Sequence, residues 1–405
     1  MEGFAGADEQ TVRAGAQEAM SCLRAAGCLA VLLCLSGCWD RNEINDYAFW
    51  IGTGLDLSED GKVKKSAQIA VPAGFKSTGE GAGGGQRANI VITASGSSIV
   101  DLEQQVQDKL PRRIFLGHRR SIFIGERLAR KGIIDLMDQF TRNTDTRMRT
   151  DIFVVNNGEG RDVLEINSPF NPFSAIVAVD QDRFCRLGDT ALRDVLLDVG
   201  RDGIRPSMPM VEIPPKNERE KNEILEVKSV AIFNRQLQMV GKVTGRESLE
   251  LFWVKGVLKN QFLTEETGGG TVSLYESNLK KTVRTEIDGN RLKAYVKLEG
   301  TGRVLENNTN IDISASSERI PLERKLNAMK AKQVEATIKK VQRQYGQDVF
   351  GIGEEIHREH PYQWKKLRDK WDQLFPTVEV SVTVKLKIQN TGGIGKRIPG
   401  IGDRA

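Results

Sequence analysis

The pattern of apolar and polar residues in the first quarter of the chain predicts a β-hairpin, a third strand and a capped helix. Apolar runs at 47–51 and 63–71 predict two strands, with a turn between them at Gly52-Thr53-Gly54. Branched residues at 88–94 predict the next strand. From Ser98 onward, apolar residues recur three or four positions apart, which predicts a helix that Ser98 caps.

Strand and helix signals continue to alternate as far as residue 155. Segments with the character of strands lie at 114–116, 121–124 and 151–155, and a helical pattern lies at 126–140. This alternation predicts a region in which helices pack against a sheet.

The second half of the chain is predicted to hold a long helix and the clearest strand. Apolar residues at helical spacing predict an amphipathic helix over 322–356, broken near Gly351 and Gly353 and ended by Pro361. Apolar and polar residues alternate strictly from 378 to 388, as expected for a half-buried strand. Further strands are expected at 227–233, 238–240 and 292–298, and a short helical stripe at 364–374.

Prolines between 206 and 215, followed by a run of charged and amide residues, mark the best candidate for a domain boundary. The expected class is α+β and multi-domain, with mixed sheets, packed helices and a lipid-anchored N-terminus. The expected parts are a signal peptide at 1–37, an N-terminal α/β region at 38–215 that could divide into two subdomains, a linker at 216–223, a C-terminal α+β domain at 224–390 and a disordered tail at 391–405.

The N-terminal apolar run ends in Leu35-Ser36-Gly37-Cys38, which resembles the bacterial lipobox. The run is about 11 residues long, whereas a helix needs roughly 20 apolar residues to cross a bilayer. We therefore expect cleavage before Cys38 and attachment of a diacylglyceryl group to its nucleophilic sulfur. An ordinary cleaved signal and a buried apolar segment are the alternatives. Because residues 1–19 are acidic where a signal should be basic, Met20 is the expected true start.

Composition indicates a globular protein, since 39% of the residues are apolar and 28% are charged. Of the five cysteines, only Cys185 lies beyond Cys38, so no disulfide is expected within one mature chain. Cys185 is expected to be a small buried apolar residue.

Positive charge is concentrated between Arg112 and Arg149, where ten lysines and arginines face four acidic residues. One interpretation is a set of solvated faces. The other is contact with anionic lipid headgroups or an acidic partner. Nucleic acid is not an expected partner, because an exported lipoprotein rarely meets any and aromatic residues for base stacking are sparse.

The chain offers little material for catalysis, since its only histidines are His118, His357 and His360. His357 and His360 are three positions apart, unlike the two histidines four apart of the zinc-protease motif. No serine stands in a Gly-x-Ser-x-Gly motif. We therefore expect no catalytic residue, no metal site and no cofactor, and Cys38 is the one site residue predicted.

Several segments, taken in this order, resemble the Ger(x)C family of spore germination lipoproteins, the C subunits of nutrient germinant receptors. The resemblance covers nearly the whole mature chain. The segments that carry it are Gly37-Cys38-Trp39-Asp40, Glu43-Ile44, Ile51-Gly52-Thr53-Gly54-Leu55-Asp56, Leu116-Gly117-His118, Ile124-Gly125-Glu126, Leu128-Ala129, Arg142, Asp348-Val349-Phe350-Gly351-Ile352-Gly353, Trp364 and Trp371.

The resemblance implies a non-enzymatic subunit, anchored by lipid on the outer face of the inner spore membrane. Such a subunit would assemble with an A subunit and a transporter-like B subunit, and nutrient binding is assigned to the membrane partner. The alternative function is a lipid-anchored extracytoplasmic solute-binding protein that captures a small molecule itself. That function would require a cleft with convergent polar groups. An anchored hydrolase is a third possibility, against which the shortage of histidines and motifs counts.

Overall fold

The structure is a computed structural model that divides the chain into two units, Met1–Tyr47 and Ala48–Ala405. In the first unit, residues 19–27 are helical and a 3-10 turn occupies Ile44–Asp46. No helix within the described residues is both long and apolar enough to cross a membrane. The predicted lipobox, the predicted linker at 216–223 and the predicted tail at 391–405 lie outside the described residues. The structure describes residues 15, 19–27, 43–71, 88–143, 145–185, 190–213, 224–267, 269–289 and 291–390.

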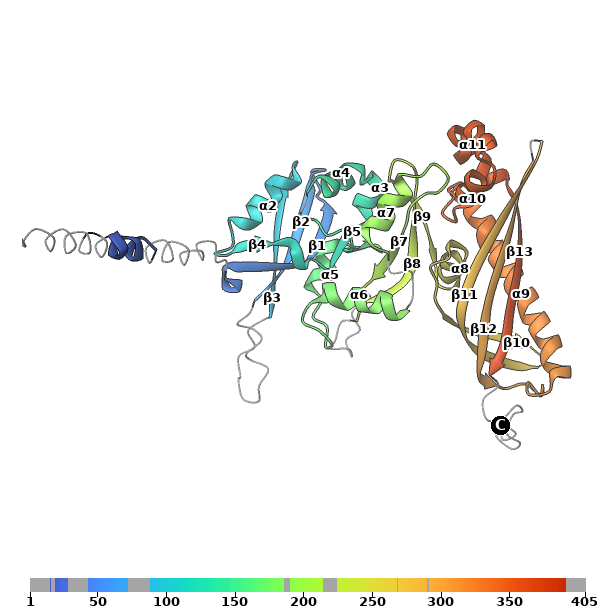
Figure 1. The fold of residues 1–405 in the computed structure, drawn as a ribbon. Coiled ribbons are helices and arrows are strands. Elements are labelled where there is room, and N and C mark those ends of the chain that lie inside the picture. Colours follow the sequence, from blue (N-terminus) through green and yellow to red (C-terminus); the bar gives the residue numbers. More distant parts are fainter. Residues whose placement is uncertain are drawn as a thin grey trace, which may run out of the picture. The chain divides into compact units, whose positions relative to one another are not determined.

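The first sheet has the strand order β3-β2-β1-β5-β6-β7-β8-β9, with β4 paired to β1 (Figure 1). Its centre is parallel, because β5 pairs in parallel with both β1 and β6, and β6 pairs in parallel with β7. The strands on either side of this centre are antiparallel. The strands are β1 (Tyr47–Leu57), β2 (Val63–Ala70), β3 (Asn89–Gly96), β4 (Arg113–Phe115), β5 (Ser121–Gly125), β6 (Asp151–Val155), β7 (Ser207–Glu212), β8 (Glu226–Phe233) and β9 (Met239–Thr244).

Helices cover both faces of the central strands. Ile122 and Ile124 belong to an apolar cluster with α3, α4 and α7, whereas the residue between them, Phe123, belongs to a cluster with α5 and α6. Figure 1 shows the two sets of helices on opposite sides of the sheet. Burial of both faces explains why β5 and β6 have consecutive apolar residues after their polar first residues, Ser121 and Asp151. The helices are α2 (Ile99–Gln107), α3 (Glu126–Lys131), α4 (Ile134–Arg142), α5 (Gly160–Glu165), α6 (Ser174–Cys185) and α7 (Leu192–Val199).

The turn predicted at Gly52-Thr53-Gly54 is wrong, because β1 continues through these residues to Leu57. The hairpin turns later, where the Ser58 amide donates to the carbonyl of Lys62 at 2.9 Å. Instead of forming a turn, the two glycines let the helices α5 and α6 come close to the backbone of β1. A Cβ on Gly52 would lie 2.5 Å from the Cβ of Ala175, and one on Gly54 would lie 2.7 Å from the backbone of Gly160. These glycines let α5 and α6 pack directly on the strand.

The single helix predicted at 126–140 is two helices, α3 and α4. They separate at Gly132, whose φ of 119° is incompatible with a continuing helix. The helix predicted from Ser98 is confirmed as α2, with the Ser98 Oγ accepting from the Asp101 amide.

The two strands on either side of the predicted linker belong to the same sheet. β7 ends before 216–223 and pairs antiparallel with β8, which begins after it. The predicted division at 216–223 therefore does not coincide with the division between the sheets, because the second sheet begins at Gln261. As a domain boundary, 216–223 stays a prediction.

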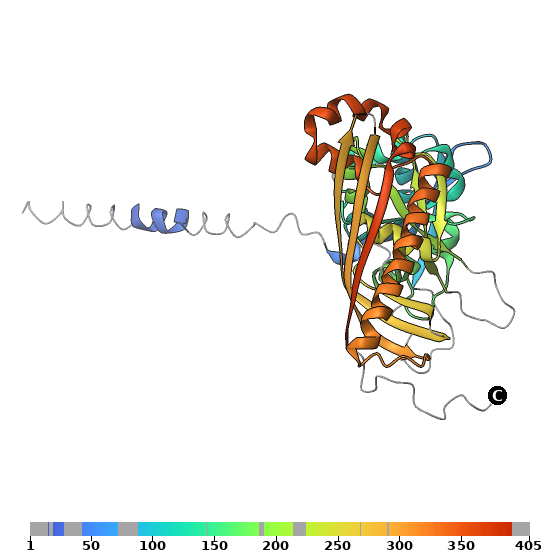
Figure 2. The same ribbon diagram turned by 90° about the vertical axis from the view of Figure 1, so that its right-hand side faces the viewer.

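The second sheet has the order β10-β11-β12-β13, with β13 added in parallel to β12. The long helix α9 lies across one face of this sheet (Figure 2). The side-chain amide of Asn327 on α9 both donates to the carbonyl of Leu386 at 3.1 Å and accepts from its amide at 2.9 Å. The elements are β10 (Gln261–Thr267), β11 (Gly270–Asp288), β12 (Arg291–Asn307), β13 (Glu379–Asn390), α8 (Arg246–Lys255), α9 (Ser316–Gln344), α10 (Ile352–Glu359), α11 (Pro361–Leu367) and α12 (Trp371–Leu374).

The long helix predicted over 322–356 is α9, which ends at Gln344, and the break predicted near Gly351 is confirmed because α10 begins at Ile352. Between these two helices the chain forms a tight loop around Asp348. The buried carboxylate of Asp348 accepts hydrogen bonds from four backbone amides, those of residues 350–353, at 2.8–3.2 Å. It also accepts the indole N–H of Trp371 at 3.1 Å. Pro361 begins α11 instead of ending the long helix, because its missing amide is not needed at the first helical position.

One contiguous apolar cluster contains residues from both sheets, including Phe153 of β6, Trp253 of α8, Val296 of β12 and Val341 of α9. The structure thus confirms the α+β class with mixed sheets and packed helices.

Candidate functional site: an arginine pocket

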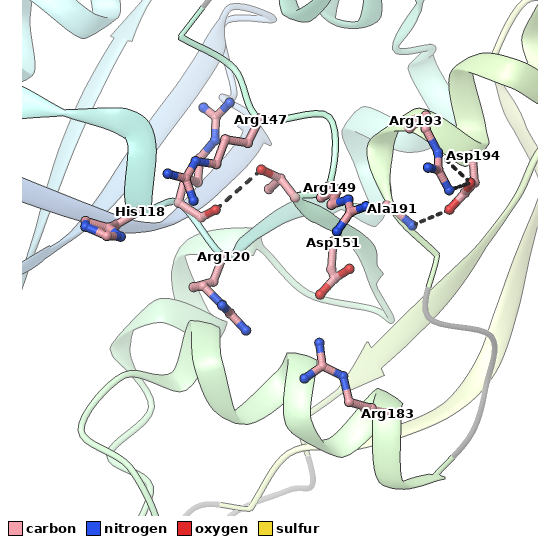
Figure 3. A pocket seen from close by; sticks show the side chains of 11 residues that line it. His118, Arg120, Arg147, Arg149, Asp151, Arg183, Ala191, Arg193 and Asp194 are labelled. Carbon is pink, nitrogen blue, oxygen red and sulfur yellow. Dashed lines mark hydrogen bonds and ion pairs between the residues drawn. The ribbon is translucent and has the colours of Figure 1, made fainter.

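A cavity of about 490 Å³ opens at the amino ends of β5 and β6 and is lined mainly by arginines (Figure 3). We call it the arginine pocket. Figure 3 shows Arg120 and Arg183 extending toward it from different elements. The lining residues are His118, Arg119, Arg120, Arg147, Arg149, Thr150, Asp151, Arg183, Ala191, Arg193 and Asp194.

Backbone pairing brings the segments of the pocket together. The Asp151 amide donates to the carbonyl of Arg120 at 3.0 Å, which aligns the two loops that precede β5 and β6. The Leu192 amide donates to the carbonyl of Thr150 at 2.9 Å, and the first turn of α7 is thereby held beside β6. Arg193 lies in that turn. Arg183 comes from the last turn of α6 on the other face of the sheet.

The carboxylates that line the pocket do not balance its arginines. Six arginines line it against two aspartates, Asp151 and Asp194. Asp194 is engaged by Arg193, at 3.0 Å, and by the Ala191 amide, at 3.1 Å. Arg120, Arg147, Arg149 and Arg183 make no ion pair with any residue that the structure describes.

Arg119 is the buried member of the set, with 3% of its surface exposed. Its Nη2 donates to the Thr146 hydroxyl at 3.2 Å, and its guanidinium carbon lies 5.3 Å from the ring centre of Phe140. Its Nε has no acceptor among the described residues. Burial lowers the pKa of Arg119 to about 10, so the side chain still carries its charge at neutral pH. The nearby Glu103 carboxylate acts in the opposite direction on this pKa.

His118 lies at the edge of the pocket, where its ring meets an aromatic pair. Its ring centre is 5.4 Å from those of Phe49 and Phe115. The two phenylalanines stand 5.8 Å apart, edge to face. His118 thus connects the pocket to the junction of β1 and β4.

Two other residues considered for chemistry in the sequence, His357 and His360, are not among those that line the pocket. Cys38 lies outside the described residues, as does the side chain of Cys185. His357 stacks on Trp364 with ring centres 5.8 Å apart, and His360 Nε2 lies 3.2 Å from the carbonyl of Thr285. Within the described ranges, no group of three or more histidine, cysteine, aspartate or glutamate residues could hold a metal ion.

The basic segment from Arg112 to Arg149 does not gather into one patch. Four of its arginines line the arginine pocket, whereas Arg127 and Arg130 line a different cavity. Sequence reasoning missed Arg183 and Arg193, which lie outside the segment. In the sequence, Arg183 lies near the end of one apolar stretch and Arg193 near the start of another. Arginines in such positions are too common to identify a binding site.

A second cavity, of about 510 Å³, lies at the opposite, carboxyl ends of the same strands. There Asp56 accepts the first two amides of α5, from Gly160 at 2.6 Å and from Arg161 at 3.1 Å. Burial raises the pKa of Asp56 to about 6, against the lowering effect of these amides. The residues around Gly54 and Asp56 that carry the family resemblance are thus used to dock α5 on the sheet.

Two family models match the chain, each over one half. The model for the spore germination protein N-terminal domain matches residues 40–213. The model described as spore germination B3/GerAC like, C-terminal, matches residues 228–392.

Named relatives match over almost the same length. Spore germination protein KC of Bacillus subtilis (strain 168) is 24% identical over 391 residues, which cover 92% of this chain and 96% of the relative. Spore germination protein B3 of the same organism is 22% identical over 370 residues, covering 90% and 97%. The crystal structure of the GerBC protein has the same fold, with a TM-score of 0.53, 18% identity, and coverage of 84% of this chain and 97% of that one. Matches to both halves and along the full relatives show that this chain belongs to the Ger(x)C family of spore germination proteins.

Proposed function

We propose that this chain is a non-enzymatic lipoprotein subunit of a spore nutrient germinant receptor. The observation that carries the proposal is the succession of the two family segments, 40–213 and 228–392, in one chain. The relatives that share both segments are named as spore germination proteins. On this proposal the chain acts by assembly, with its two sheets serving as a scaffold for partner contacts.

The proposed partners are the A and B membrane subunits of the receptor. The proposed location is the outer face of the inner spore membrane, where a diacylglyceryl group on Cys38 anchors the chain. Two acyl chains bind stably, at about 0.8 kcal/mol per buried methylene, where one chain would bind only marginally. Signal cleavage before Cys38 and initiation at Met20 belong to the same proposal.

The second candidate function is a lipid-anchored solute-binding protein. The arginine pocket favours it, because a cavity of about 490 Å³ is large enough for a small molecule. A ligand there would be anionic, which restricts the solutes that such a protein could capture.

Affinity purification of the tagged full chain from detergent-extracted spores separates the two functions. We expect two membrane proteins to copurify in a constant ratio, and a strain lacking the B subunit provides the control. A chain recovered alone, with a nutrient bound to it, would contradict the receptor proposal and support solute binding.

A further inference from the structure

We infer that the arginine pocket is a binding site for a small phosphate-bearing anion. This inference concerns a ligand of the chain itself and does not depend on the proposed assembly with membrane subunits.

The first support is convergence. The six arginines come from four separate parts of the chain: the loops before β5 and β6, the end of α6 and the start of α7. Like charges repel, so solvated arginines would be expected to spread over the surface unless an anion compensated them. By contrast, Arg130 and Arg142, from the same basic segment, each pair with an acidic residue four positions earlier.

The second support is Arg119. A buried cation without a carboxylate contact is costly, because burial removes water without replacing its favourable interactions. Arg119 has one hydrogen bond to a neutral hydroxyl, and its Nε has no acceptor in the described part of the chain. The nearby Glu103 carboxylate is paired with Lys65, so an oxyanion in the adjoining cavity would give Arg119 a direct anionic acceptor.

The third support is the identity of the cations, since arginine supplies all six and lysine none. The planar guanidinium presents parallel N–H donors that match two oxygens of one phosphate, which the point charge of lysine cannot do. With several guanidiniums around one cavity, a doubly charged phosphate or a pair of linked phosphates fits better than a single carboxylate.

Two sources could supply such a group: a soluble phosphorylated molecule or the headgroup of an anionic phospholipid. The first arm of the test is calorimetric titration of the detergent-purified full chain with inorganic pyrophosphate. Citrate at equal ionic strength is the competing anion. The second arm is flotation of the full-length Cys38→Ala chain with vesicles of phosphatidylglycerol in phosphatidylcholine, with pure phosphatidylcholine vesicles as the background.

Both arms use the same pair of variants. Arg147→Gln with Arg149→Gln removes two exposed cations from the pocket. Arg284→Gln with Arg291→Gln removes two exposed cations from the second sheet and serves as the matched control. Because a charge-assisted hydrogen bond contributes about tenfold or more to affinity, the pocket variant should bind at least about tenfold more weakly. The control should stay within about twofold of the wild-type affinity.

Loss of pyrophosphate binding in the pocket variant alone would support a soluble phosphate ligand. Loss of phosphatidylglycerol-vesicle binding in that variant alone would support a lipid headgroup. The inference is overturned if neither probe binds in a pocket-dependent way, if both variant pairs lose affinity equally, or if citrate binds as tightly as pyrophosphate.

Discussion

Replacement of Glu276 by glutamine should make the protein more stable at alkaline pH. Glu276 lies in β11 with none of its surface exposed. Its Oε2 accepts the side-chain amide of Gln261 on the paired strand at 2.6 Å, whereas its Oε1 has no hydrogen bond within the described residues. A carboxylate with one oxygen unsatisfied in the interior is poorly stabilised as an anion.

Burial raises the pKa of Glu276 to about 7, and the nearby Glu265 carboxylate adds to this effect. Lys330, Gln261 and Arg246 act in the opposite direction. Because the folded state binds the proton more tightly than the unfolded state does, the free energy of unfolding falls as the pH rises from about 4.5 to about 7. One pKa unit corresponds to about 1.4 kcal/mol, so Glu276 lowers the free energy of unfolding by about 3 kcal/mol above pH 7.

The measurement is urea unfolding of the full chain in detergent, followed by circular dichroism at several pH values from 4.5 to 8.5. Glutamine at position 276 keeps the shape of the side chain and cannot ionise. The free energy of unfolding of Glu276→Gln should therefore not fall in this way between pH 4.5 and about 7. At pH 8 the variant should exceed wild type by about 3 kcal/mol, and near pH 4.5 the two should be similar. Glu266→Gln removes the same charge from an exposed position on β10 and should follow the wild-type profile.

The reasoning would be refuted by parallel pH profiles for wild type and Glu276→Gln, or by a variant less stable than wild type at pH 8. If Glu266→Gln raised the free energy of unfolding at pH 8 by a similar amount, the effect would be due to net charge and not to the burial of Glu276.

Three further predictions test the fold and the anchor. Gly160→Ala should lower the free energy of unfolding by about 1–3 kcal/mol, because the added Cβ would lie 2.5 Å from the carbonyl oxygen of Phe123. Gly200→Ala is the control: its Cβ would have no contact nearer than 3.6 Å, so the free energy of unfolding should change little in the same urea titration. Asp348→Ala should lower the free energy of unfolding by about 3 kcal/mol or more, because it leaves four backbone amides and the Trp371 indole without their acceptor. Unchanged urea unfolding would contradict this role. Cys38→Ala should leave the body folded but release it from spore membranes and impair germination, as measured by fractionation and by loss of optical density after nutrient addition. Normal germination by a soluble variant at normal abundance would rule out the anchoring role.

Strands with a clear local pattern of apolar residues were the most predictable elements from sequence. The strand predicted at 378–388 is β13, and the strand predicted at 151–155 is β6 with the same bounds. For β13 the alternation sufficed, because the burial of each residue depends on which side of the strand it faces. For β6, which is buried on both faces, a short run of apolar residues was the signal. The cap at Ser98 was also predictable, since its hydrogen bond joins residues three positions apart.

Elements whose form depends on distant contacts were not predictable in this way. Gly52 and Gly54 have the composition of a turn, and only the approach of α5 and α6 shows why they lie inside a strand. The loop after Gln344 likewise depends on Asp348 and on Trp371, which lies 23 positions further along the chain.

By itself, the sequence determined the family, most of the strands that alternate, and the excess of positive charge between Arg112 and Arg149. Only the tertiary structure decided which of these cations lie together around one pocket. Parallel pairing brings the starts of β5 and β6 together, and α6 and α7 add Arg183 and Arg193 to the arginines there. Neighbours in a parallel sheet are separated in sequence by whole helices, so such a pocket leaves no local pattern in the chain.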